Sequence, residues 1–187
     1  MKKSLADLLE AHPVPKQKEK PPYKIYCDMD GVLTDFESRF EHYAGMQPKA
    51  YENKYGEAAF WELIDGKIGE RFWSGMPWMS RGKELWNLIK DYNPSILTSP
   101  SRNQVSRDGK QSWVDSHLSP TPEVIFAFSE RFKNARTKSF YSNENSILID
   151  DRDDNINNWI AKGGIGLQVH NGNITPVLEK LHELGYE

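Results

Sequence analysis

The stretch "YKIYCDMDGVLTDF", residues 23–36, decides the fold. Its first part is an apolar run typical of a buried strand, and that run stops at Asp28 and Asp30, with Gly31 directly after them. Two carboxylates one residue apart repel each other, so a hydrophobic strand that ends on them needs a compensating charge. Ligands of parallel α/β sheets bind beyond the carboxyl ends of the strands. We therefore predict that this acidic pair lies in a binding site and shares a cation there.

The rest of the chain alternates between strand and helix patterns. Apolar runs predict further strands at residues 95–99, 123–128, 146–151 and 164–169. Helical patterns occupy residues 81–91, 107–118, 153–162 and 175–184. This alternation predicts an α/β protein, a three-layer Rossmann-like fold with a parallel central sheet covered by helices on both faces.

Two segments interrupt that alternation. Residues 36–75 contain helical pieces broken by glycines and a proline, and we expect them to form a small helical cap over residues 36–79. The core domain would then comprise residues 23–35 and 80–187. Residues 1–22 are predicted to be an N-terminal tail and proline-rich linker. We expect this tail to be mobile, and a short helix over residues 4–12 that docks on the domain or on a partner is the alternative.

Composition narrows the function classes. The 187 residues suffice for one core with a small insertion, and the net charge of −3 argues against a protein that coats nucleic acid. The single cysteine, Cys27, excludes an internal disulfide and a CxxC metal site, and we expect it to be buried and inert. The chain lacks an apolar run of roughly 18 residues and an N-terminal apolar signal core. We expect no membrane partner and a cytoplasmic location.

Three of the predicted strands end in side chains with oxygen atoms. These residues are Asp28 and Asp30, Thr98 and Ser99, and Asp150 and Asp151. Clustered carboxylates without nitrogen or sulfur ligands favour a hard cation, and Mg²⁺ with water and phosphate completes such a site. Calcium fits poorly, because Gly31 is fourth from Asp28, whereas an EF-hand loop needs glycine at the sixth position.

These motifs together resemble a known superfamily. "DMDGVLTDF", residues 28–36, is similar to the DxDGx(T/V/L) first motif of the haloacid dehalogenase (HAD) superfamily of phosphohydrolases. "ILTS", residues 96–99, resembles its second motif, and "ILIDD", residues 147–151, resembles its fourth. The resemblance covers about residues 23–170, and the order and spacing agree.

The resemblance implies a role for each acid. Asp28 would attack phosphorus and become an aspartyl-phosphate, and Asp30 would protonate the leaving oxygen and then activate water. Family members that keep the phosphoenzyme have threonine at the second position, so Asp30 favours hydrolysis. The Mg²⁺ ligands implied by the resemblance are the Asp28 carboxylate, the Asp30 main-chain carbonyl and Asp151, with Asp150 in support.

The resemblance also implies groups that neutralise the phosphate. Thr98 and Ser99 would donate hydrogen bonds to its oxygens, and a lysine would balance its charge. Three lysines between the second and fourth motifs are candidates, namely Lys110, Lys133 and Lys138. We favour Lys138, which precedes the acidic pair by twelve residues, and expect Lys110 to be an exposed helical lysine.

Within the superfamily, the motifs most resemble the 5′(3′)-deoxyribonucleotidases. That resemblance implies a small-molecule substrate, a deoxynucleoside monophosphate, under a cap whose aromatic side chains stack on the base. The candidate substrate contacts are Phe36, Phe72, Trp73 and Trp78. Arg102 is a further candidate for a phosphate or base contact. The competing interpretation is that aromatic residues at helical spacing belong to the core.

Other functions stay open at this point. The same chemistry could serve a polynucleotide 3′-phosphatase, although the negative net charge does not favour an extended nucleic-acid surface, or a phosphatase of another small metabolite. A non-catalytic module that uses the acids for metal-dependent docking is a third class. The presence of both Asp28 and Asp30 argues against it.

Overall fold

The computed structural model describes residues 21–128 and 137–187. The predicted tail helix over residues 4–12 and the candidate Lys133 lie outside the described residues. Within the described parts of the chain, none of the helices combines the length and the apolar character needed to cross a membrane.

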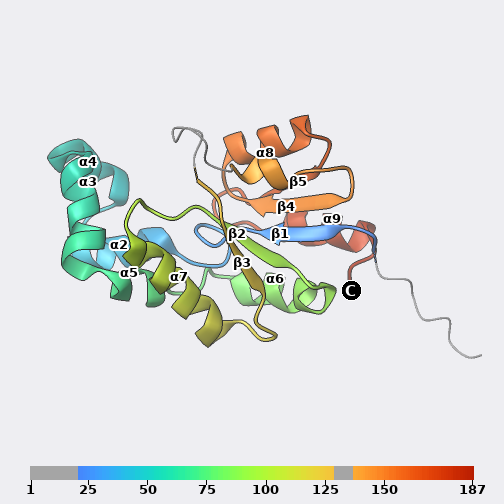
Figure 1. Cartoon of the computed structure of the whole chain (residues 1–187), viewed down its shortest axis with the longest axis horizontal. Coiled ribbons are helices and arrows are strands. Elements are labelled where there is room, and N and C mark those ends of the chain that lie inside the picture. The colour runs from blue at the N-terminus through green and yellow to red at the C-terminus, as the bar shows by residue number, and fades with distance from the viewer. Residues whose placement is uncertain (1–20, 129–136) are drawn as a thin grey trace, which may run out of the picture.

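A five-stranded parallel sheet forms the centre of the molecule (Figure 1). Its strands are β1 (Lys24–Cys27), β2 (Ser95–Thr98), β3 (Glu123–Phe126), β4 (Ser146–Asp150) and β5 (Ile165–Gln168). Their order in the sheet is β3-β2-β1-β4-β5, so β1 is central, with β2 on one side and β4 on the other. All five strands agree with those predicted from apolar runs, and the α/β fold class is confirmed.

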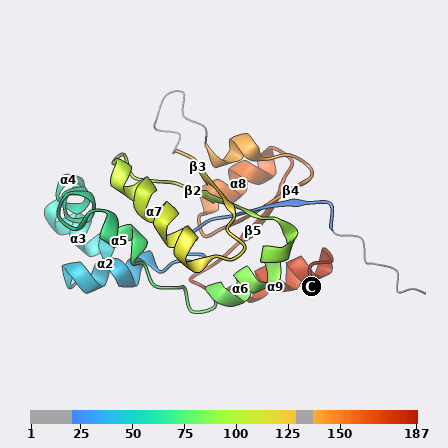
Figure 2. The ribbon, with the colours of Figure 1, turned by 60° about the horizontal axis from the view of Figure 1, so that its bottom comes forward.

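Helices cover both faces of the sheet (Figures 1 and 2). One face packs against α6 (Gly82–Ile89), α7 (Gln104–His117) and α9 (Thr175–Glu183), and the other packs against α8 (Asp153–Ala161). Side chains alternate along β1, so Ile25 and Cys27 belong to the first core cluster while Tyr26 packs against the second. Short 3₁₀ turns are η2 (Lys90–Tyr92) and η3 (Lys138–Tyr141).

A group of short helices is inserted between β1 and β2, and Figure 1 shows it to one side of the sheet. The group, called the inserted helices below, comprises α2 (Phe36–Ala44), α3 (Pro48–Tyr55), α4 (Glu57–Trp61), the π-helix η1 (Glu62–Ile68) and α5 (Glu70–Ser74). Asp35 caps α2 by accepting a hydrogen bond of 2.9 Å from the Ser38 N–H.

Helix α5 joins the inserted helices to the core by packing directly against α7. The approach is close at Gly109, where an added Cβ would lie 2.6 Å from the Cβ of Trp73 and 2.7 Å from the carbonyl oxygen of Glu70. Only glycine leaves room for that contact. The inserted helices are therefore fixed to the element that follows β2, directly beside the strand ends.

Candidate active site

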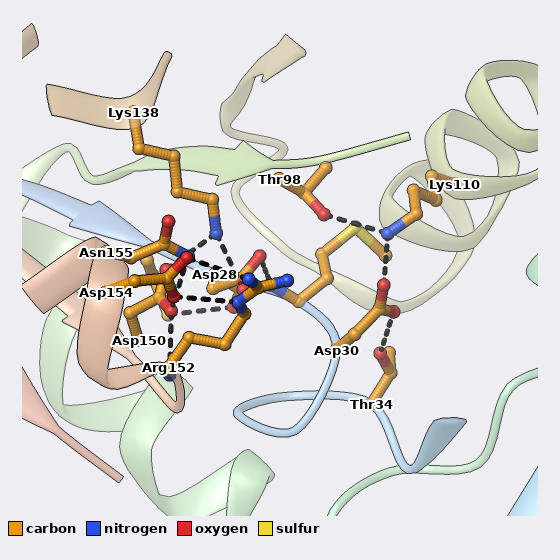
Figure 3. Close-up of polar contacts among 12 residues, drawn as sticks. Asp28, Asp30, Thr34, Thr98, Lys110, Lys138, Asp150, Arg152, Asp154 and Asn155 are labelled. Carbon is orange, nitrogen blue, oxygen red and sulfur yellow. Dashed lines mark hydrogen bonds and ion pairs between the residues drawn. The ribbon is translucent and has the colours of Figure 1, made fainter. Parts of the chain in front are cut away.

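The predicted strand-end residues meet at one edge of the sheet (Figure 3). Asp28 follows β1, Thr98 ends β2, and Asp150 ends β4. Because these three strands are neighbours and parallel, their carboxyl ends lie side by side. The structure thus brings together residues that are about 50 to 120 positions apart in the chain.

Lys138 bridges two of the acids. Its Nζ lies 2.7 Å from Asp28 Oδ2 and 2.6 Å from Asp150 Oδ2, and all three side chains are buried. Burial alone would lower the pKa of Lys138, but the two carboxylates outweigh it and raise that pKa above its usual range. Lys138 is therefore held as a cation beside the carboxylate of Asp28.

Asp150 is fixed from several sides. Its Oδ1 accepts hydrogen bonds from the Arg152 N–H at 3.0 Å and from Asn155 Nδ2 at 2.9 Å, while Oδ2 accepts from Lys138. The side chain is fully buried, and burial raises its pKa although the Lys138 ammonium opposes that shift. Asp150 is thus well placed to orient Lys138.

Three carboxylates could hold a metal ion. One oxygen from each of Asp28, Asp150 and Asp151 lies within 4.8 Å of the others. Burial and the charges of the other two acids raise the pKa of Asp151 to about 7, so the cluster has a surplus of negative charge that a cation would relieve. Gly31 has φ +77°, and a Cβ there would lie 2.5 Å from Asp151 Oδ2. The all-oxygen donor set and the space left by Gly31 fit Mg²⁺.

Asp30 has a different set of partners. Its Oδ1 accepts a hydrogen bond of 3.1 Å from Thr34 Oγ1, and its Oδ2 lies 2.6 Å from Lys110 Nζ. Lys110 also donates to Thr98 Oγ1 at 2.8 Å. Each acid of the opening motif therefore has its own lysine.

The expectation that Lys110 is an exposed helical lysine is wrong. Its side chain is fully buried. The physical reason lies in helix periodicity, because Lys110 precedes the buried Trp113 and Val114 by three and four residues and shares their inward face of α7. That spacing is the sequence signal that could have identified it.

A cavity of about 1180 Å³ lies above the strand ends. The expected site residues that line it are Asp28, Asp30, Phe36, Trp73, Ser99, Arg102, Lys138 and Asp151. Its other wall comes from the inserted helices. The cavity is therefore bounded both by the acids at the sheet edge and by the segment in which an aromatic wall was expected.

Two of the four aromatic candidates do not line this cavity. Phe72 is fully buried in the main core cluster. Trp78 packs instead against Trp113, with ring centroids 4.8 Å apart. Trp73, the helical neighbour of Phe72, belongs to the same core cluster and is only 2% exposed, but it borders the cavity and donates from Nε1 to Asp65 Oδ1 at 3.0 Å.

Sequence reasoning also missed several residues of the cavity wall. Trp61 lines it with a partly exposed ring, and the inserted helices and their start add acids, namely Asp35, Glu37, Glu57, Glu62 and Asp65. Burial raises the pKa of Asp65, against hydrogen bonds from Ser101 and Trp73. All charged residues between positions 57 and 65 are acidic, and this pattern in the sequence could have indicated an acidic cavity wall.

Comparisons with known proteins agree with the fold. A predicted phosphatase from Clostridium acetobutylicum is 14% identical, with a TM-score of 0.54 over 88% of this chain and 91% of that chain. A HAD family enzyme from Bacteroides thetaiotaomicron, solved as a magnesium complex, is 16% identical, with a TM-score of 0.51 over 86% and 100%. A haloacid dehalogenase-like family hydrolase from Xanthomonas campestris is 15% identical, with a TM-score of 0.51 over 90% and 96%.

No family model matches the sequence, and no curated protein does either. At identities of 14–16%, the structural likeness shows the fold, which is the HAD Rossmann-like fold expected from the motifs.

Proposed function

We propose that this protein is a Mg²⁺-dependent phosphomonoesterase that works through an aspartyl-phosphate intermediate. The observation that carries the proposal is the position of Asp28 at the cavity floor, 2.7 Å from the buried ammonium of Lys138. A carboxylate that faces a cavity beside a fixed cation can attack a phosphoryl group whose charge the cation balances. The fold of the structural neighbours is consistent with this chemistry.

The reaction would proceed in two steps. In the first, an Asp28 oxygen bonds to phosphorus, the ester P–O bond breaks, and Asp30 gives its proton to the leaving oxygen. In the second, water attacks the aspartyl-phosphate while Asp30 takes a proton from it. The bond between phosphorus and the Asp28 oxygen then breaks and inorganic phosphate leaves.

The metal would be held by Asp28 and Asp151, with Asp150 close behind them. When bound, Mg²⁺ would screen the repulsion between the carboxylate and the phosphate. Ser99, which lines the cavity, and the buried Thr98, which ends β2 just before it, would donate hydrogen bonds to the phosphoryl oxygens. Lys138 would remain the fixed cation beside the transferring group.

For the substrate we propose a deoxynucleoside monophosphate, with the inserted helices acting as the cap. The cavity wall offers the side chains of Phe36 and Trp61 for stacking, whereas Trp73 borders the cavity but is almost fully buried. Stacking of a base on such a ring contributes roughly 1–3 kcal/mol. The volume of about 1180 Å³ leaves room for a nucleotide.

The charge of the cavity wall supports a monomeric substrate over a nucleic-acid end. The acids Glu37, Glu57 and Glu62 line the side contributed by the inserted helices. A neutral nucleoside can lie against that wall, whereas further backbone phosphates of a DNA or RNA strand would be repelled. This observation disfavours the polynucleotide 3′-phosphatase alternative.

The test is phosphate release in the presence of Mg²⁺ from 5′- and 3′-deoxynucleoside monophosphates, sugar phosphates and 3′-phosphorylated oligonucleotides. Asp28→Asn is the control that should remove all turnover while the fold persists. Selective turnover of the mononucleotides is the expected result. Turnover by Asp28→Asn would overturn the proposed nucleophile, and turnover of oligonucleotide ends alone would overturn the proposed substrate.

A further inference from the structure

We propose that Lys110 is a positioning residue that holds Asp30 in the orientation needed for proton transfer in both steps. This inference rests on the proposed function, because it assigns a role within that reaction. Its basis is the pair formed by Lys110 Nζ and Asp30 Oδ2 at 2.6 Å, which is separate from the pair formed by Lys138 and Asp28 (Figure 3).

Side chains from two different parts of the chain hydrogen-bond to the Asp30 carboxylate. Thr34, four residues later, donates to Oδ1 at 3.1 Å, and Lys110 of α7 reaches Oδ2 from a helix eighty residues away in sequence. One contact would leave the carboxylate free to rotate, whereas two contacts to different oxygens fix its plane. The Asp30 side chain remains 29% exposed and lines the cavity, so the fixed group still faces the substrate space.

Lys110 is itself fixed by Thr98. Its Nζ donates to Thr98 Oγ1 at 2.8 Å. An ammonium can only donate hydrogen bonds, so the Thr98 hydroxyl accepts in this contact and keeps its own proton available. That proton can point to a phosphoryl oxygen. Lys110 therefore links the residue that would bind the phosphate to the residue that would handle the proton.

The complete burial of Lys110 indicates that its positive charge, and not its packing, is what this position requires. The side chain is fully buried, on the helix face that carries Trp113 and Val114. An ammonium is expensive to bury, and an apolar residue would fill this position more favourably if packing alone mattered. The two polar partners of Lys110, Asp30 and Thr98, both take part in the proposed reaction, so the buried charge acts on residues that matter for catalysis.

The same lysine also contacts the inserted helices. Its Nζ lies 5.2 Å from the centroid of the Trp73 ring, within the range of a cation–π contact. The neighbouring Gly109 permits this close approach, as described above for α5 and α7. Asp30 is therefore oriented by a lysine held between the sheet edge and the cavity wall.

The experiment compares Lys110→Met with the wild type on two substrates. 4-Nitrophenyl phosphate has a good leaving group, so its first step needs little help from a proton donor, whereas a deoxynucleoside 5′-monophosphate has a poor one. For the nucleotide, kcat should fall by about 10²-fold, the lower range for loss of general acid–base catalysis, while KM changes little. For 4-nitrophenyl phosphate, a rapid burst of nitrophenolate followed by slow turnover is expected, because only the second step then needs Asp30.

A double-mutant cycle separates this role from a general effect on packing. In an Asp30→Asn background, Lys110→Met should cause no further loss of kcat, because the residue through which it acts is gone. The double variant also leaves no unpaired charge between the two positions, so it keeps the test valid if the single variant folds poorly. Additive losses would overturn the proposal.

A matched control is Lys162→Met, which changes an exposed lysine at the end of α8 and should leave both substrates unaffected. If the wild type and Lys162→Met hydrolyse neither substrate, the proposed function has failed. If they are active and Lys110→Met has equal losses on both substrates without a burst, only the positioning role has failed.

Discussion

Lys138 Nζ and Asp28 Oδ2 form a buried ion pair 2.7 Å long at the end of the central strand. The pair explains how the acidic motif after β1 is tolerated. Asp28 is balanced by Lys138, and Asp30 is balanced by Lys110 at 2.6 Å. The repulsion between the two acids is therefore relieved in part by two buried lysines, and the Mg²⁺ that we expect at the site would relieve the rest.

Replacing Lys138 with methionine should lower both activity and stability. The substitution would leave Asp28 and Asp150 buried without their shared cation, and the loss of one partner from such a buried pair costs about 3–5 kcal/mol in the free energy of unfolding. We expect kcat to fall by about 10²–10³-fold, the usual effect of removing a group that stabilises the transferring charge. Urea unfolding and steady-state kinetics measure the two effects.

Mg²⁺ should restore part of the stability lost in Lys138→Met, because a cation bound to the carboxylates replaces part of the missing charge. Unfolding would be repeated with and without the ion, and Lys162→Met is the control on an exposed lysine. Equal stability of Lys138→Met and the wild type would contradict the buried pair.

Gly31→Ala should weaken Mg²⁺ binding by about 10- to 100-fold, the usual cost of disturbing the surroundings of a metal ligand. The new Cβ would lie 2.5 Å from Asp151 Oδ2 and would push that carboxylate out of the cluster. Gly45→Ala is a matched control, because Gly45 has φ +67°, close to the +77° of Gly31, but has no neighbour within 4 Å of an added Cβ. Both variants therefore have similar backbone strain. Titration calorimetry with Mg²⁺ should separate them, and equal affinities would exclude the steric explanation.

The sheet could be predicted because its strands are short, largely apolar runs, and two of them, β2 and β4, are buried at every position. The run in β4, "SILID", is buried at every position. A fully buried parallel strand is a short, nearly continuous apolar run, so it can be recognised from its own residues alone. Positions at strand ends follow from the sheet, so Asp28, Thr98 and Asp150 could be expected to meet. Helix ends depend on local capping, and α7 begins at Gln104 instead of the predicted residue 107 because Asn103 caps it, accepting from the Val105 N–H at 3.3 Å.

The differences between the predicted and observed environments of Phe72, Trp73 and Lys110 have one physical origin. The sequence does not show which part of the protein each face of a helix packs against. Phe72 and Trp73 are adjacent on a helix and so point about 100° apart, and the packing of α5 on α7 buries both rings in the core while only Trp73 also borders the cavity. For Lys110, residue type suggested exposure whereas periodicity indicated burial. The cost of burying its charge is offset by Asp30 and Thr98, which are distant in sequence.

The stability of the protein should fall as the pH rises from about 10 to about 12. Burial raises the pKa of Tyr186 to about 12, and its hydroxyl donates to the Tyr23 carbonyl at 2.9 Å. Below pH 10 the phenol is protonated in both the folded and unfolded states. Above it the unfolded chain loses the proton while the folded chain must keep it, so unfolding becomes more favourable.

Tyr186→Phe should be less stable at pH 8, by about 1 kcal/mol for the lost hydrogen bond, and should lack this part of the pH dependence. Parallel slopes for both proteins in urea unfolding between pH 9 and 11 would contradict it.

Trp61→Ala should raise the KM for a deoxynucleoside monophosphate and leave kcat nearly unchanged. Its ring lines the cavity and is 37% exposed, so its removal should cost little folding stability. Loss of one stacking contact of about 1–3 kcal/mol predicts a rise in KM of roughly 5- to 150-fold.

Glycerol phosphate, which has no ring to stack, should be hydrolysed by Trp61→Ala with unchanged KM. Tyr55→Ala, at another exposed aromatic of the inserted helices that does not line the cavity, should behave like the wild type on both substrates. A similar rise in KM for glycerol phosphate would mean that Trp61 shapes the cavity in general and does not hold a base.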